Sequence, residues 1–229
     1  MATSGTATWT LQVDEIIDEA LERIGGNPQT GNEQKSARRS LNLICKDWIN
    51  RGILLWAVDE VSQTLTDGTA NYTLGTDTVD ILDAVIRETN GTDITDHTIT
   101  RISREDYLEI PNKDDKAKPS QWFLDRQRVA PILYLYPTPN DSTDAFRYRR
   151  RRKIEDIDAS YQDVDVPDRY LPSLTSGLAY YMSQKRPQID INRRQELKVQ
   201  YEEEFERAIT EDRERVDVRI IPDIGYYNV

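Results

Sequence analysis

Apolar residues recur at three- and four-residue steps in four segments of the chain, and this spacing predicts four amphipathic helices. The first predicted helix covers residues 13–24, with Thr10 as its expected N-cap, and the second covers residues 37–49. Two more are expected over residues 171–182 and 197–209. Either pair alone would leave much of its apolar surface in water, so we expect all four helices to close into one bundle.

Between the two helical pairs, residues 53–153 lack the helical period and contain short runs rich in Val, Ile, Thr and Tyr. Asp-Gly at residues 67–68 and Asn-Gly at residues 90–91 favour tight turns. We therefore expect one hairpin over residues 61–74 and a second over residues 79–102. The pattern as a whole predicts an inserted antiparallel β domain.

A proline-broken turn, YPTP at residues 136–139, lies between predicted strands at residues 132–136 and 145–150. Its prolines cannot donate to a β ladder, so we expect the chain to reverse there and the two strands to run antiparallel. Another strand is expected at residues 121–125. A capping pattern that begins at Ser103 predicts a short helix through residue 110.

The predicted fold class is α+β: a four-helix bundle built from N- and C-terminal helix pairs, with an inserted antiparallel β region and an extended C-terminal arm. The expected parts are an N-terminal helical pair (residues 1–52), the β domain (53–153), a C-terminal helical pair (154–213) and the arm (214–229).

The arm carries apolar anchors but no pattern that predicts independent folding, so we expect it to become ordered on a partner. Its anchors are Val216, Val218, Ile220, Ile221, Pro222, Ile224, Tyr226 and Tyr227.

The net charge of −11 argues against a general attraction to nucleic acid or to an anionic membrane surface. No apolar run approaches the roughly 20 residues that a membrane-spanning helix needs. The first ten residues lack both a cationic start and an apolar core, so we expect no secretory signal and synthesis in the cytoplasm.

Candidate catalytic residues are scarce. His97 is the only histidine, which excludes histidine-based metal clusters, and the single Cys45 lies on the apolar side of a predicted helix, as a core residue would. Asp93 and Asp96 could bind a divalent ion, but they stand where turn chemistry places aspartates anyway. We expect no enzyme activity, no metal and no cofactor.

A cationic run in the last predicted strand is the exception in an acidic chain. A basic strand could hold phosphates and bind DNA whatever its sequence. Arginines on a strand could equally pair with carboxylates on neighbouring strands or on the next subunit, and the excess of Asp and Glu favours this interpretation. The run consists of Arg147, Arg149, Arg150, Arg151, Arg152 and Lys153.

Several ordered motifs accompany this run: ARRSLNLICKDWINRG in the second helix, YPTP before a YRRR strand, and DVP followed by YLPSLTSGLAYYMSQKR in the third helix. In this order the chain resembles the head-to-tail adaptor (connector) proteins of tailed bacteriophages, especially the tubular adaptors of short-tailed phages. The resemblance covers most of residues 10–221.

The resemblance implies a structural virion protein that assembles as a homo-oligomeric ring, commonly of twelve subunits, below the portal protein. The ring would join the portal to a tail nozzle or another tail protein, with DNA crossing its channel in passage only. The arm would reach into the portal. From the residues themselves, we expect Arg147 and Arg149 to Arg152 to serve subunit or tail contacts. The alternatives are a nucleic-acid-binding protein that uses the basic strand, and another neck or tail-completion protein.

Overall fold

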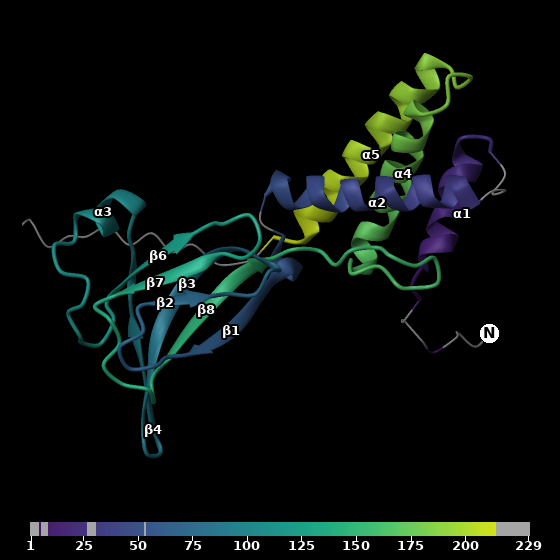
Figure 1. Ribbon diagram of the computed structural model, residues 1–229. Coiled ribbons are helices and arrows are strands. Elements are labelled where there is room, and N and C mark those ends of the chain that lie inside the picture. The colour runs from purple at the N-terminus through teal and green to yellow at the C-terminus, as the bar shows by residue number, and fades with distance from the viewer. Residues whose placement is uncertain (1–4, 6–8, 27–30, 53, 214–229) are drawn as a thin grey trace, which may run out of the picture.

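The computed structural model describes residues 5, 9–26, 31–52 and 54–213. These residues form five α-helices and two four-stranded β-sheets, which confirms the α+β class. Figure 1 shows four long helices at one end of the molecule and the strands, with a short helix, at the other. We call these parts the helical body and the β body. The helical body contains α1 (Val13–Arg23), α2 (Gly31–Arg51), α4 (Leu171–Gln184) and α5 (Ile191–Glu211).

Helix α4 contacts each of the other three long helices, and buried apolar residues of all four belong to one hydrophobic cluster. Helix α2 lies across α4 and α5 in Figure 1. Trp48 of α2 stacks on Phe205 of α5 with 5.2 Å between ring centroids. A Cβ atom at Gly177 would lie 2.8 Å from the Tyr201 ring, so α4 and α5 can pack this closely only with glycine at that position.

Helix α1 begins at Val13 with Gln12 as its N-cap, so the prediction of Thr10 is wrong. The connector, residues 153–167 between the last strand and α4, explains the difference. Its carbonyl oxygens accept hydrogen bonds from the N–H groups of Val13 (3.1 Å) and Asp14 (2.9 Å). These N–H groups have no partner within the helix, so the connector determines where α1 starts.

The connector also completes the core of the helical body. Asn42 of α2 donates to the carbonyl of Ile157 (3.0 Å) and accepts from its N–H (2.9 Å). Ile154, Ile157 and Val164 of the connector are all buried in the helical cluster. An irregular segment thus supplies core residues that helical periodicity does not indicate.

The β body has its own hydrophobic cluster, to which both sheets contribute. Trp122 of one sheet meets Phe146 of the other edge to face, at 6.2 Å between ring centroids. In spatial order, the first sheet contains β1 (Val58–Thr64), β8 (Ala145–Arg152), β3 (Thr78–Asn90) and β4 (Asp93–Thr98). The second contains β2 (Asn71–Thr73), β7 (Ile132–Tyr136), β6 (Gln121–Asp125) and β5 (Thr100–Arg101).

The hairpin between β3 and β4 is confirmed, whereas two other predicted strand pairs are wrong. Strand β1 pairs with β8 and β2 pairs with β7, so residues 61–74 do not form a hairpin. Strands β7 and β8 likewise belong to different sheets. The two segments that change sheet run side by side: Leu65 N–H donates to Asp144 O (3.0 Å) and Gly68 N–H to Pro139 O (2.9 Å).

The far end of the second predicted hairpin also differs, because β5 leaves the first sheet and pairs in parallel with β6. The short helix α3 (Arg104–Glu109) follows and confirms the predicted cap: Ser103 Oγ accepts from Asp106 N–H (3.1 Å). Tyr107 of α3 packs against Tyr134 of β7, with ring centroids 5.2 Å apart.

Candidate functional site

Strand β8 carries the cationic run through the middle of the first sheet, between β1 and β3. Side chains alternate along it: Phe146 and Tyr148 enter the β cluster, whereas Arg147 and Arg149 lie on the opposite face. The register places Arg149 beside Glu60 of β1 on one side and beside β3 on the other. The arginines therefore lie between two strands that carry carboxylates.

On the outer face of this sheet Arg147 and Arg149 each have a carboxylate partner. Arg147 pairs with Glu60, and Arg149 Nε donates to Asp83 Oδ1 at 2.9 Å. The hydrogen bond from Arg149 holds the pKa of Asp83 below its usual value. A third pair of the same kind, Arg87 of β3 with Asp96 of β4 at 2.6 Å, extends the row. We call this set of pairs the ion-pair face.

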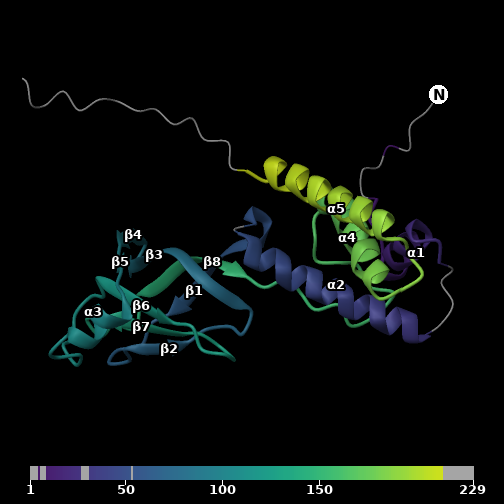
Figure 2. The ribbon, with the colours of Figure 1, turned by 90° about the horizontal axis from the view of Figure 1, so that it is seen from above.

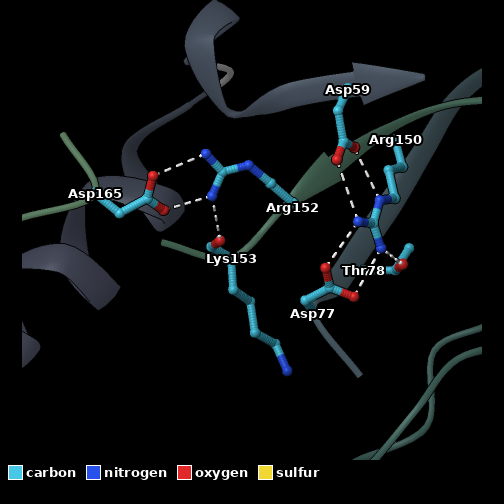
Figure 3. Close-up of polar contacts among 7 residues, drawn as sticks. All are labelled: Asp59, Asp77, Thr78, Arg150, Arg152, Lys153 and Asp165. Carbon is cyan, nitrogen blue, oxygen red and sulfur yellow. Dashed lines mark hydrogen bonds and ion pairs between the residues drawn. The ribbon is translucent and has the colours of Figure 1, made fainter. Parts of the chain in front are cut away.

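Arg150 is held between two aspartates near the junction of the two bodies (Figure 3). Its Nε donates to Asp59 Oδ1 at 2.8 Å, and both terminal nitrogens donate to Asp77 at 2.7 Å. One of these nitrogens also donates to Thr78 Oγ1 at 2.8 Å. Hydrogen bonding to Arg150 lowers the pKa of Asp77. The guanidinium, whose side chain is only 12% exposed, thus has its charge balanced within the chain.

Arg152 joins the strand to the connector (Figure 3). Its Nη2 donates to Asp165 Oδ1 at 3.0 Å, and its guanidinium lies 5.8 Å from the centroid of the Trp56 ring. Arg151 donates to the Gly52 carbonyl at 3.3 Å, just beyond the end of α2. Lys153 Nζ donates to Thr76 O at 2.6 Å. These three side chains tie β8 to the segments where the two bodies meet.

The structure therefore pairs Arg147, Arg149, Arg150 and Arg152 with carboxylates of their own chain, whereas among the described residues Arg151 donates only to a backbone carbonyl. These four ion pairs make phosphate binding less favourable, because a phosphate would have to compete with a carboxylate at each of these arginines. Contact of these residues with another subunit or with a tail protein stays a prediction. Arg149, with 59% of its side chain exposed, is well placed for such a contact.

No role was predicted from the sequence for Asp212, a buried carboxylate at the end of α5. Asp212 accepts from the Leu55 N–H at 2.9 Å and from the Tyr170 hydroxyl at 3.2 Å, and it pairs with Arg169. The three- and four-residue spacing of the apolar residues along α5 continues to Asp212. This spacing was the feature of the sequence from which its burial could have been predicted. Asp212 therefore joins the C-terminal end of α5 to the segment between α2 and β1.

The other candidates contribute no reactive site. His97 Nε2 lies 2.8 Å from Glu88 Oε2 across the β3–β4 hairpin, and Cys45 is buried in the helical cluster. Over residues 9–26, 31–52 and 54–213, no group of three or more His, Cys, Asp or Glu side chains is arranged to hold a metal ion. The same part of the chain contains no helix long and apolar enough to cross a membrane. The predicted portal-binding anchors, residues 216–227, lie outside the described residues.

The chain is similar to a known protein family. The model of a family described as SU10 adaptor protein matches residues 5–222, which include both the helical body and the β body. No curated protein matches the chain.

Proposed function

The chain belongs to the SU10 adaptor protein family, a family of bacteriophage head-to-tail adaptors, and on this premise we propose that it forms a ring below the portal and joins the portal to the tail. Membership implies a structural, non-catalytic protein of the virion neck that contacts portal and tail proteins and oligomerises. The finer proposal is a ring of twelve subunits, made in the host cytoplasm and added to the filled head.

The extent of the family match carries this proposal. It includes both hydrophobic clusters and the ion-paired junction between them, so the adaptor role applies to the whole chain and not to one of its parts. In a ring, the four helices would act as one bundle that supports the β body. The exposed ion-pair face would then be available for contacts with the next subunit or with the tail.

We propose that DNA crosses the ring in passage only. A protein with a net charge of −11 repels the phosphate backbone, and four of the five arginines of β8 are paired with carboxylates of the same chain. A channel wall of this kind would let DNA slide without tight binding. This argument favours an adaptor over a protein that uses the basic strand to bind nucleic acid.

The arm is proposed as the portal contact. Its apolar anchors could offset the entropy lost on ordering, at about 1.5–3 kcal/mol for each fully buried aliphatic or aromatic side chain. Repetition around a ring would add avidity. The anchors are Val216, Val218, Ile220, Ile221, Pro222, Ile224, Tyr226 and Tyr227.

Mass measurement of the purified chain, alone and mixed with a portal ring of the same phage, tests the proposal. We expect a defined complex that contains one portal ring and a closed set of adaptor subunits. A chain that neither associates with the portal nor forms an oligomer on it would contradict the proposed function.

A further inference from the structure

Helix α1 turns a strongly acidic face away from the helical core. Its eleven residues include five carboxylates and one arginine, and that arginine, Arg23, pairs with Glu19 at 2.9 Å. Asp18 and Glu22 have no ion pair or hydrogen-bond partner for their carboxylates among the described residues. Like charges held this close favour a cationic partner from outside the helix.

An apolar groove of about 480 Å³ lies beside these carboxylates. Trp9 and Leu11 line it on the side of α1, and Leu171 and Pro172 of α4 line it on the other. The Trp9 side chain is 70% exposed, which is unusual for a tryptophan beside an apolar groove. An acidic rim around an apolar groove suits a surface that presents an aliphatic side chain next to basic ones.

Helix α2 presents such a surface. Lys35, Arg39 and Leu43 follow one another at four-residue steps on its outer face, and Leu43 is 55% exposed. Lys35 and Arg39 have no carboxylate partner in the part of the chain that the structure describes. Helix α2 carries five basic and two acidic side chains, in a protein whose net charge is −11.

The two surfaces lie on different helices and point in different directions. Figure 2 shows α2 along one margin of the helical body and α1 at its end. Each of these two faces lies opposite the buried residues of its own helix. The two faces therefore cannot contact each other within one chain. A contact between two different patches of identical chains propagates from each subunit to the next, and it closes when the rotation between subunits completes a ring.

We propose that the outer face of α2 in one subunit docks into the α1–α4 groove of the next, with Leu43 entering the groove and Lys35 and Arg39 meeting Asp18 and Glu22. The occupant of the groove is thus a second copy of this chain. The inference rests on the proposed ring and specifies which surfaces build it.

Charge reversal on both sides tests the contact. Lys35→Glu with Arg39→Glu, or Asp18→Lys with Glu22→Lys, should each weaken oligomer formation on the portal ring by about tenfold or more, because like charges then face each other. A chain that carries all four substitutions should regain assembly, since every interface is then reversed on both sides. The control is Lys198→Glu on α5, an exposed lysine with no ion pair among the described residues, which should assemble normally.

Cysteine pairs give a readout that does not depend on affinity. A chain with Leu11→Cys and Leu43→Cys should oxidise, on the portal ring, into a ladder of covalent multimers of the 26.6 kDa chain. Either single variant should give no ladder. Burial raises the pKa of the native Cys45 thiol to about 12, which keeps it unreactive at neutral pH.

Two outcomes would overturn the inference while leaving the proposed function intact. In the first, the wild-type chain forms its ring on the portal, but the reversed variants assemble normally or no covalent ladder appears. In the second, the α1 reversal blocks portal docking, the α2 reversal has no effect and the fourfold variant is not rescued. This second result would assign the groove to another protein. Failure of the wild-type chain to oligomerise on the portal at all would instead contradict the ring itself.

Discussion

The indole N–H of Trp48 donates a hydrogen bond to the Tyr201 hydroxyl at 2.8 Å, between α2 and α5 in the centre of the helical body. Both side chains are almost completely buried, so the indole has no water to replace this acceptor. Burial raises the pKa of Tyr201 well above its usual value, so the phenol stays protonated. This buried hydrogen bond joins the same two helices that Arg51 of α2 and Glu202 of α5 join by an ion pair at 2.6 Å.

Removing that acceptor should destabilise the protein. Tyr201→Phe leaves the Trp48 N–H buried without a partner, which costs about 1–3 kcal/mol in the free energy of unfolding. Urea denaturation followed by tryptophan fluorescence measures the change. Tyr161→Phe is the matched control, because Tyr161 is 80% exposed and should show almost no effect. Equal effects of the two substitutions would contradict the structural role of the hydrogen bond.

A buried carboxylate in the shared helical cluster should unfold the helical body. Leu41→Asp and Leu178→Asp each place a charge at a fully buried position, at a cost of several kcal/mol. Leu43→Asp lies two residues from Leu41 on the exposed face of α2 and should change the free energy of unfolding by about 0.5 kcal/mol or less. Circular dichroism during heating distinguishes the two classes. An unchanged melting temperature for either buried variant would show that the four helices do not share one core.

Stability should decrease in acid because several carboxylates are ionised more readily in the folded state. Hydrogen bonds from Lys118 and His97 lower the pKa of Glu88 to about 2, and the bond from Arg149 lowers that of Asp83. These groups stabilise the fold above their unfolded pKa values of about 4, and the contribution is lost as the pH falls through the folded values.

The free energy of unfolding should therefore decrease between about pH 5 and pH 2.5, as denaturant titrations at each pH can measure. Arg149→Gln should make the decrease smaller, because Asp83 then titrates closer to its unfolded value. Lys198→Gln should leave the pH dependence unchanged. Identical curves for Arg149→Gln and the wild type would show that the pair with Asp83 contributes nothing to stability.

The arginine strand should not retain DNA at ordinary ionic strength. In a gel retardation assay at about 0.15 M salt, the wild-type chain and the variant with Arg149, Arg150 and Arg151 replaced by Gln should both leave DNA unshifted. The same variant should bind its subunit or tail partner less well, and Arg128→Gln serves as a control outside the strand. Strong DNA binding by the wild type that disappears in the triple variant, with assembly intact, would support nucleic-acid binding instead.

Truncation after Arg215 should separate folding from docking. The melting temperature should stay within error, because the helical and β clusters lie entirely before residue 213. Docking onto portal-bearing, DNA-filled heads should be lost with the anchors. Normal docking of the truncated chain would remove the arm from the portal contact.

The sequence predicts the long helices well because their buried apolar residues recur about once per helical turn. Ala37, Leu41, Ile44 and Trp48 of α2 show this spacing. Strand pairing was harder, since the partner of β1 lies nearly ninety residues away at β8 and a local Asp-Gly signal pointed to the wrong neighbour. The excess of Asp and Glu in the composition made it predictable that the arginines pair with carboxylates. The particular partners of Arg150 were not predictable, because Asp59 and Asp77 come from separate segments of the chain.

The connector has a consequence for how the chain folds during synthesis. The β body, residues 58–152, is contiguous and has its own cluster, so it can fold as soon as β8 has emerged from the ribosome. Helices α1 and α2 must wait for Ile157, Val164 and the whole of α4 and α5 before their stripes are covered. A nascent chain therefore carries a finished β body between two unfinished halves of the helical body, and only a completed chain can offer its helical surfaces to a neighbour.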